Sequence, residues 1–187
     1  RICVDFKATI NQYVYVDPHP LPRFEDIVAK LGGSEHFSVI DRSDGYLQME
    51  VDEVSRKYMV IATHMGYYRY KRLPFGVSFA PAIFQKTMDN ILAGIPVTAV
   101  YIDDIIVAGK SKAEHLQLVQ EVLTRLKQAN IRLKREKCRF FQTQVTYLGH
   151  RIDKQGIHPT QERSEAVRNM PAPNNSKELK SFLGAIN

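Results

Sequence analysis

The sequence predicts an α+β fold, in which helices pack against antiparallel strands. Two apolar runs, VTAVYI and IIVAG, flank Asp103 and Asp104, and this short gap is typical of a tight hairpin. A second pair of strand-like runs, KYMVIAT and GYYRYKRL, adjoins across His64-Met65-Gly66. Other segments repeat apolar residues at the helical period between capping signals. Hairpins mixed with helices favour an α+β fold over a doubly wound parallel sheet.

The first third of the chain predicts one helix and two strands. ICVDF near the start alternates apolar and polar residues, as a strand does. The Pro-rich VDPHPLP (16–22) predicts a surface connection, with a polyproline peptide ligand as the alternative. Pro22 opens a helix over RFEDIVAKL, which Gly32-Gly33 ends. HFSVIDRSDGYLQMEV (36–51) is rich in β-branched and aromatic residues and predicts a strand that leads into a turn.

The remaining two thirds predict three helices around the aspartate hairpin. A helix starts at Ser78 and Pro81 and ends at Gly94, and its apolar positions keep a helical period: Ile83, Phe84, Met88, Ile91 and Leu92. A capping box over Ser111–Glu114 opens a second helix, which runs to about Ala129. Strands follow at VTYLGHRI, and residues 175–178 cap a last helix.

Length and composition indicate an ordinary globular domain. The chain has 187 residues, 44% of them hydrophobic, and no apolar run approaches the ~20 residues of a membrane span. A net charge of +6 favours an anionic partner such as nucleic acid, although charge alone leaves other partners open. Cys3 and Cys138 match no zinc spacing, and we expect two reduced thiols, with a disulfide as the alternative. The six histidines are scattered and predict no metal site. Because the chain begins at Arg1 and ends in mid-pattern, we expect it to be a piece of a longer protein.

The strongest functional signal is the pair Asp103-Asp104 inside an apolar hairpin. Asn-Gly or Asp-Gly would suit a hairpin tip better, and adjacent carboxylates repel unless a cation is near. No His or paired Arg lies close in sequence, and Mg²⁺ prefers carboxylate oxygens. Asp41 closes the apolar strand FSVID and supplies a third carboxylate. Three such aspartates could hold two Mg²⁺ ions for phosphoryl transfer, while an exposed acidic turn remains the alternative.

Four blocks of sequence occur in the order of the reverse transcriptase signature: FSVIDRSDGYLQ, RLPFGVSFAPAIFQ, YIDDIIV and YLGH. They resemble most closely the blocks of Ty3/gypsy-type LTR retrotransposon polyproteins, and the similarity covers the whole chain. The resemblance implies a right-hand polymerase core of fingers and palm, with an antiparallel palm sheet backed by helices. It places the fingers at about 1–15 and 50–77, the palm at about 16–49 and 78–150, and the start of a truncated thumb at 151–187.

The resemblance also implies site residues. Asp41, Asp103 and Asp104 would be catalytic and would ligate two Mg²⁺ ions, or Mn²⁺ in their place, and Lys137 would protonate the leaving pyrophosphate. The nucleotide-binding residues would be Arg1, Asp44, Gly45, Tyr46, Phe75 and Gly76, with Tyr46 excluding a ribose 2′-OH. The primer and template would meet Gln85, Tyr101, Tyr147, Leu148, Gly149 and His150. The alternatives are a core tyrosine at Tyr46, a solvated helix face at Gln85 and a solvated basic strip around Lys137.

By this resemblance the protein is an RNA-directed DNA polymerase, a nucleotidyltransferase that adds dNTP to a primer 3′-OH. The expected partners are an RNA template, the DNA primer or product, dNTP, and the ribonuclease H and integrase regions of a polyprotein, with no membrane. Assembly in cytoplasmic virus-like particles is expected, with nuclear access left open and no secretion.

One residue departs from the family pattern. Arg42 stands where Leu or Val usually follows the first aspartate, and on a strand its side chain points away from Asp41 toward the core. Arg42 and the missing thumb leave an inactive remnant that at most binds nucleic acid as the rival hypothesis. An RNA-dependent RNA polymerase is disfavoured by Tyr46.

Overall fold

The computed structural model describes residues 4–15, 19–42 and 44–186. Its centre is an antiparallel sheet of four strands in the order β4-β5-β1-β6. These strands are β1 (His36–Asp41), β4 (Thr98–Tyr101), β5 (Asp104–Gly109) and β6 (Arg139–Gln142). The predicted aspartate hairpin is therefore β4–β5, and β1 pairs with β5 along its full length.

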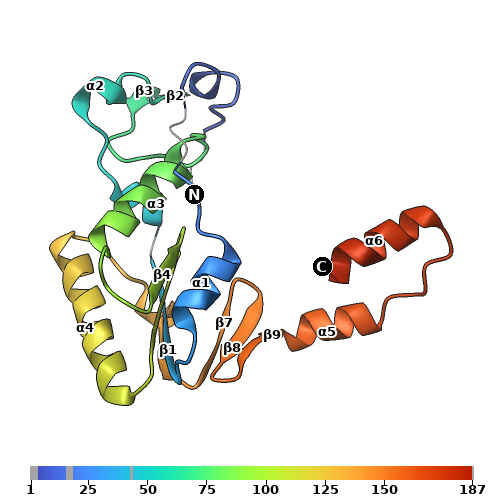
Figure 1. The fold of residues 1–187 in the computed structure, drawn as a ribbon. Helices are drawn as coiled ribbons and strands as arrows, with labels where there is room; N and C mark the ends of the chain where they lie inside the picture. The colour runs from blue at the N-terminus through green and yellow to red at the C-terminus, as the bar shows by residue number, and fades with distance from the viewer. Residues whose placement is uncertain (1–3, 16–18, 43, 187) are drawn as a thin grey trace.

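Helices and a second sheet cover the two faces of this central sheet (Figure 1). Alternate residues of β5 point to opposite sides, as a strand requires. Ile105 and Val107 pack with α3 (Ala80–Ile91) and α4 (Lys112–Gln128). Ile106 and Ala108 pack with α1 (Phe24–Leu31) and with the sheet β7-β8-β9. A fully buried side chain such as Ile105 contributes roughly 1.5–3 kcal/mol to stability, so the β4–β5 hairpin is firmly anchored on both faces.

The local signals explain the helices. Ser111 caps α4, because its hydroxyl accepts the backbone N–H of Glu114 at 3.2 Å. Pro81 lies in the first turn of α3, where its missing N–H costs nothing. The predicted helix over 23–31 is present as α1. The predicted cap at Asn175 is present too, since its side chain accepts the N–H of Glu178 at 2.9 Å ahead of α6 (Ser176–Ile186).

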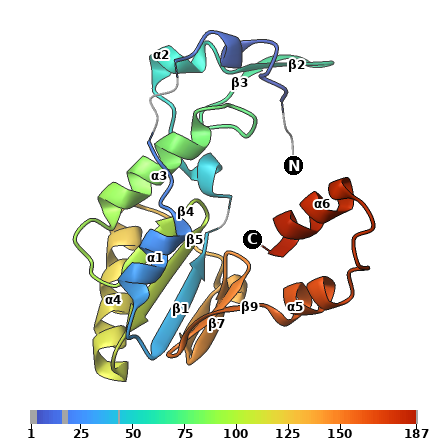
Figure 2. The same ribbon diagram turned by 45° about the vertical axis from the view of Figure 1, so that its right-hand side comes forward.

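A small lobe lies at one end of the molecule, in the region predicted to be the fingers (Figures 1 and 2). It contains the 3₁₀ turn η1 (Ile10–Gln12), the short helix α2 (Glu53–Arg56) and the hairpin of β2 (Val60–Thr63) and β3 (Gly66–Arg69). A separate apolar cluster holds it together: Phe6, Val51, Met59, Leu73, Val77 and Ala80. Ala80 opens α3, so this helix connects the small lobe to the central sheet.

The C-terminal part continues the strand pairing further than predicted. β7 (Gln144–Tyr147), β8 (His150–Asp153) and β9 (Gly156–Pro159) form one antiparallel sheet, so a boundary at residue 151 falls inside β8. The strands predicted at VTYLGHRI are present as the hairpin of β7 and β8. Beyond it α5 (Gln161–Arg168) leads away from the sheets, and α6 turns back beside α5 (Figures 1 and 2).

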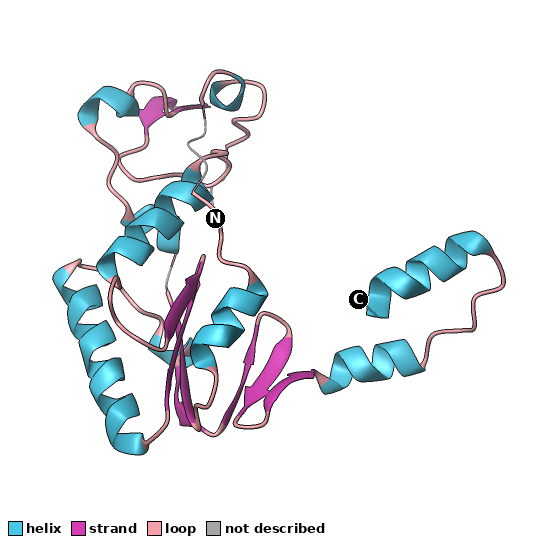
Figure 3. Ribbon diagram, in the orientation of Figure 1, coloured by secondary structure: helices cyan, strands magenta, loops and turns pink. Residues whose placement is uncertain are grey.

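The secondary structure differs from the sequence prediction in a few places (Figure 3). Residues 4–6 of the predicted first strand have no regular structure, and residues 1–3 lie outside the described part. β6, β9, α2 and α5 were not predicted, because each is short or weakly periodic. Cys138 is a free thiol, and Cys3 lies outside the described residues. Within the described residues, no helix combines the length and apolarity that crossing a membrane requires.

His115 of α4 is completely buried against β1 and gives a testable pH dependence of stability. Ser38 Oγ accepts the N–H of Phe141 at 3.2 Å and also shares a hydrogen bond of 2.8 Å with His115 Nε2. Burial lowers the pKa of His115 from its ordinary 6.5. The unfolded chain therefore binds the proton more tightly, and this stability is present above pH 6.5 and is lost as pH falls below it.

We expect the wild type to lose about 1 kcal/mol more unfolding free energy between pH 7.5 and 5.5 than His115→Gln does. The glutamine keeps an acceptor for Ser38 without titrating, and the other histidines cancel in the difference. Urea unfolding at the two pH values measures it. An identical pH dependence in both proteins would show that His115 is not the responsible group.

Candidate functional site

Two of the three predicted aspartates face each other across neighbouring strands. Asp41 ends β1 and lies opposite Asp104, the first residue of β5. Tyr101 is the other register partner of Asp104, so the two-residue turn consists of Ile102 and Asp103. The expectation that Asp103-Asp104 forms the hairpin tip is therefore wrong by one residue. Asp104 belongs to the ladder and is partly buried, whereas Asp103 is exposed in the turn beside it.

A cavity of about 190 Å³ collects residues from distant parts of the chain. The lining residues are Asp41, Arg42, Asp44, Gly45, Phe75, Asp103, Lys134 and Lys137. All of them except Arg42 and Lys134 were predicted as site residues. Lys134 was missed because it is one of several basic residues in LKREK. Its backbone N–H donates to the Asp41 carbonyl at 3.1 Å, which fixes this segment against the end of β1.

Residues of the protein supply positive charge to the aspartates. Lys137, in the 3₁₀ turn η3 (Arg135–Lys137), places Nζ 3.6 Å from Asp41 Oδ2. The buried Arg42 donates from Nε to the backbone carbonyl of Asp103 at 3.1 Å. Neither cation comes to the site as a neighbour in sequence of both strands, since the segment after α4 brings Lys137 to the end of β1.

Mutual repulsion among the carboxylates persists in spite of these cations. The pKa of Asp104 is raised above its ordinary value, first by burial and then by the charges of Asp41 and Asp103. Three hard oxygen donors that repel one another suit a divalent cation such as Mg²⁺. In the described residues, however, no three His, Cys, Asp or Glu side chains are already gathered at metal-binding spacing. The chemistry of the donors fits, and Asp41 and Asp104 are the pair that the fold holds in register.

Close packing explains the glycine in the loop after β1. Asp44 adopts a left-handed conformation with φ 47°, and Gly45 begins the 3₁₀ turn η2 (Gly45–Gln48). A Cβ on Gly45 would lie 2.6 Å from Asp103 Oδ1 and 2.7 Å from Phe84 Cζ, so only glycine lets the loop approach the β4–β5 turn.

Tyr46 follows directly and packs against two aromatic rings. Its ring centroid lies 5.2 Å from that of Phe75 and 5.4 Å from that of Phe84. Burial and then the charge of Asp103 raise the pKa of Tyr46, so its hydroxyl is protonated at neutral pH. These contacts hold the ring rigid beside the cavity. Its exclusion of ribonucleotides stays a prediction.

Two residues predicted to touch primer or template are buried. Gln85 is 0% exposed, which rules out the solvated helix face, and its carboxamide bonds to the backbone of the β4–β5 hairpin. Tyr147 is 2% exposed, and its hydroxyl donates to the Asp104 carbonyl at 3.3 Å. Their side chains therefore support the hairpin from within instead of reaching the surface. No local signal in the sequence indicated this burial, since Lys86 follows Gln85 and Thr146 precedes Tyr147.

The remaining members of the YLGH block form a tight turn. Leu148 and Gly149 connect β7 to β8 with φ of 47° and 75°, as a two-residue hairpin of the primed type requires. His150 stacks on Phe24 at 4.3 Å between ring centroids, a contact that the sequence did not indicate. Their contact with a primer stays a prediction, as does that of Tyr101.

The other nucleotide-site residues are divided between the two lobes. Gly76 has φ 92°, and a Cβ there would lie 2.6 Å from the Val4 carbonyl oxygen, so it lets the segment after Phe75 pack on the small lobe. The predicted triphosphate contact Arg1 lies outside the described residues.

Comparison with known proteins decides the family. Residues 1–152 match the family described as reverse transcriptase (RNA-dependent DNA polymerase). The chain belongs to the reverse transcriptase family. It is 45% identical over 186 residues to an uncharacterized Caenorhabditis elegans protein, covering 99% of the chain and 14% of that protein. It is 38% identical to the Pol polyprotein of transposon 297 of Drosophila melanogaster, covering 98% of the chain and 18% of the polyprotein. It is 36% identical to the Tf2-7 transposon polyprotein of Schizosaccharomyces pombe, covering 100% of the chain and 14% of the polyprotein.

Solved reverse transcriptases confirm the predicted fold. The foamy viral protease-reverse transcriptase in complex with double-stranded DNA superimposes with a TM-score of 0.87 at 28% identity, covering 100% of the chain and 33% of that structure. The same viral protein with an RNA/DNA hybrid gives a TM-score of 0.82 at 28% identity, covering 98% and 25%. The resemblance to retrotransposon reverse transcriptases is thus confirmed, and the chain spans less than a fifth of the length of the three relatives compared.

Proposed function

We propose that this chain is the fingers and palm of an RNA-directed DNA polymerase in a retrotransposon polyprotein. The observation that carries the proposal is the register pairing of Asp41 with Asp104, with Asp103 and Lys137 at the same cavity, in a reverse transcriptase fold. The reaction joins a primer 3′-OH to the α-phosphate of a dNTP and releases pyrophosphate. The template is RNA or DNA, by analogy with the duplexes bound by the foamy viral protein.

Each group at the cavity has a role that its chemistry supports. Asp41, Asp103 and Asp104 would hold divalent metal, which when bound neutralises phosphate charge and lowers the pKa of the attacking hydroxyl. The loop at Asp44 and Gly45 would place its backbone against the triphosphate. Lys137 lies close enough to Asp41 to be held at the cavity, and its ammonium group would give a proton to the departing pyrophosphate.

The whole protein would carry further activities. We propose ribonuclease H and integrase regions elsewhere in the polyprotein, because the relatives named as polyproteins are several times longer than this chain. Assembly into cytoplasmic particles follows from the same proposal.

Primer extension tests the proposed activity directly. The full-length protein containing these residues is incubated with an RNA template, a DNA primer, dNTPs and MgCl₂. Extension that requires both template and Mg²⁺ supports the proposal. A folded protein that binds the primer–template but never extends it would establish the rival reading of an inactive remnant.

Tyr46 provides a prediction about substrate choice. Replacing it by Ala removes the ring that Phe75 and Phe84 hold in place, so we expect discrimination against rNTPs to fall by about tenfold or more. Tyr46→Phe keeps the ring and should keep the discrimination. Single-nucleotide incorporation with dNTP and rNTP measures the ratio of kcat/KM values. Equal ratios in the Ala and Phe proteins would assign Tyr46 to core packing only.

A further inference from the structure

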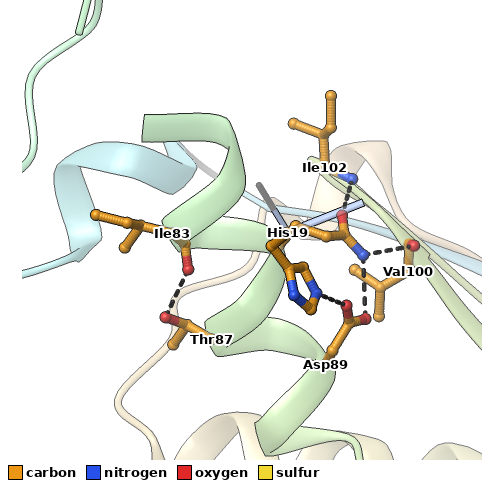
Figure 4. Close-up of polar contacts among 7 residues, drawn as sticks. His19, Ile83, Thr87, Asp89, Val100 and Ile102 are labelled. Carbon is orange, nitrogen blue, oxygen red and sulfur yellow. Dashed lines mark hydrogen bonds and ion pairs between the residues drawn. The ribbon is translucent and has the colours of Figure 1, made fainter. Parts of the chain in front are cut away.

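The buried carboxamide of Gln85 completes the edge of the central sheet. Its Nε2 donates to the Val100 carbonyl at 2.9 Å, and its Oε1 accepts the Ile102 N–H at 2.8 Å (Figure 4). A residue of a parallel strand makes the same two bonds, one to each neighbour of the residue that it faces. β4 is an edge strand, so this side chain takes the place of a missing strand at the last step before the catalytic turn.

The turn that Gln85 holds is strained. Ile102 has φ 48°, a conformation that a β-branched residue rarely adopts. Such a conformation persists only where the surroundings hold it, and at Ile102 the bond to Gln85 Oε1 does so. Because Asp103 is the next residue in the turn, release of the Ile102 amide would displace the carboxylate of Asp103 from the cavity.

Gln85 is itself oriented by a chain of polar contacts that reaches the surface. Its Nε2 also donates to Asp89 Oδ1 at 3.0 Å, one helical turn further along α3. The other carboxylate oxygen of Asp89, Oδ2, lies 2.7 Å from His19 Nε2 (Figure 4). Asp89 accepts the second amide hydrogen of Gln85, and this fixes which end of the carboxamide faces Ile102. His19 and Asp89 are 29% and 40% exposed, so without His19 the carboxylate could turn to water.

We propose that His19 is a positioning residue for the catalytic hairpin and acts through Asp89 and Gln85. The expected effect of His19 on the rate of nucleotide incorporation rests on the proposed function. The structural part of the inference, that His19 helps to hold the Ile102 amide, does not depend on catalytic activity. His19 lies ahead of α1, outside all four signature blocks, and donates Nε2–H to Asp89, which keeps the carboxylate directed at Gln85.

Amide exchange at Ile102 tests the structural part without any catalysis. Hydrogen exchange mass spectrometry on the full-length protein, resolved to this amide, should show about tenfold faster exchange in His19→Ala, the loss expected for one weakened hydrogen bond. His19→Gln keeps an N–H donor and should restore slow exchange. The matched control is His158→Ala, which breaks another His–Asp pair (3.0 Å, to Asp153) that has no connection to Gln85. Unchanged Ile102 exchange in His19→Ala would overturn the proposal.

Single-turnover incorporation tests the effect on the rate. We expect His19→Ala to lower the maximal rate by about tenfold with the KM for dNTP unchanged, because the defect lies in placing Asp103 and not in binding the nucleotide. In a Gln85→Ala background the further change from His19→Ala should vanish, since both act along one path. If His19→Ala lowers the incorporation rate by the same factor in the wild type and in the Gln85→Ala protein, His19 does not act through Gln85. If the wild type does not extend primers, the proposed function fails, while the exchange experiment still decides the role of His19.

Discussion

Asp104→Asn is expected to lower nucleotide incorporation by about a thousandfold or more, and yet to stabilise the metal-free protein. The loss follows because Asp104 is one of the two carboxylates that the β1–β5 register holds together. The gain in stability follows because burial, Asp41 and Asp103 raise the pKa of Asp104 above 3.8. The folded state therefore binds the proton more tightly than the unfolded state, and this favourable contribution is lost as pH rises from 3.8 through the raised pKa. At neutral pH the ionised carboxylate costs free energy.

Asparagine keeps the shape of the side chain and removes the charge. Asp104 is only partly buried, so solvent screening limits the gain to about 1 kcal/mol, or ~2–4 °C in melting temperature. Thermal unfolding in EDTA at pH 7.5 measures it, and the difference should shrink at pH 4. The control is Glu35→Gln, which neutralises an exposed carboxylate in the loop ahead of β1 and should change neither property. A variant that loses activity and is also less stable in EDTA would mean that Asp104 is needed for folding and would contradict the repulsion argued here.

The sequence could predict the elements of the site because each lies in a strongly patterned segment. Asp41 ends an apolar strand, and Asp104 begins another, so their meeting required only that these strands pair. The hairpin turn was misplaced by one residue because turn preferences disfavour Ile102, and tertiary contacts from Gln85 overrule them. Lys137 could be predicted only by resemblance, since nothing in the basic run LKREK distinguishes it before the chain folds.

The burial of polar side chains was the least predictable feature. Gln85 and His115 occupy polar positions in amphipathic helices, and only the packed structure shows that their partners are Val100, Ile102 and Ser38. A long-range pair such as His19 and Asp89 is 70 residues apart in sequence and leaves no local signal. Burial of Arg42, by contrast, was predicted correctly from strand alternation, because the residue after Asp41 must face the other side.

Arg42 is a buried cation beneath the aspartates. Its side chain is 3% exposed, and its Cζ lies 4.6 Å from the Phe84 ring centroid. Its backbone forms an isolated antiparallel β-bridge with Leu133. Burial lowers the pKa of Arg42 to about 10, and the negative charges of Asp103 and Asp104 limit this decrease. The guanidinium therefore stays charged at neutral pH. Among the described residues, its buried Nη1 and Nη2 have no hydrogen-bond partner, so what favours the charge there is the field of the carboxylates together with the Phe84 ring.

A fixed positive charge in this position opposes the binding of a second cation to the same carboxylates. We therefore expect Arg42→Met to raise the affinity for Mg²⁺ by roughly tenfold, because methionine fills much of the volume without the charge. Mg²⁺ titrations of the melting temperature measure this directly, and the MgCl₂ concentration for half-maximal primer extension should fall in parallel.

Arg42→Ala separates packing from charge. It leaves a cavity beside Phe84 as well as removing the cation, so we expect it to cost about 3–5 kcal/mol of unfolding free energy, whereas Arg42→Met stays near the wild type once Mg²⁺ is bound. Arg139→Met is a suitable control, since this exposed arginine of β6 does not line the cavity and its loss should leave Mg²⁺ affinity unchanged. If Arg42→Met folds normally and binds Mg²⁺ no more tightly than the wild type, the guanidinium does not act on the carboxylates. Its role would then be confined to the packing against Phe84 and the hydrogen bond to the Asp103 carbonyl.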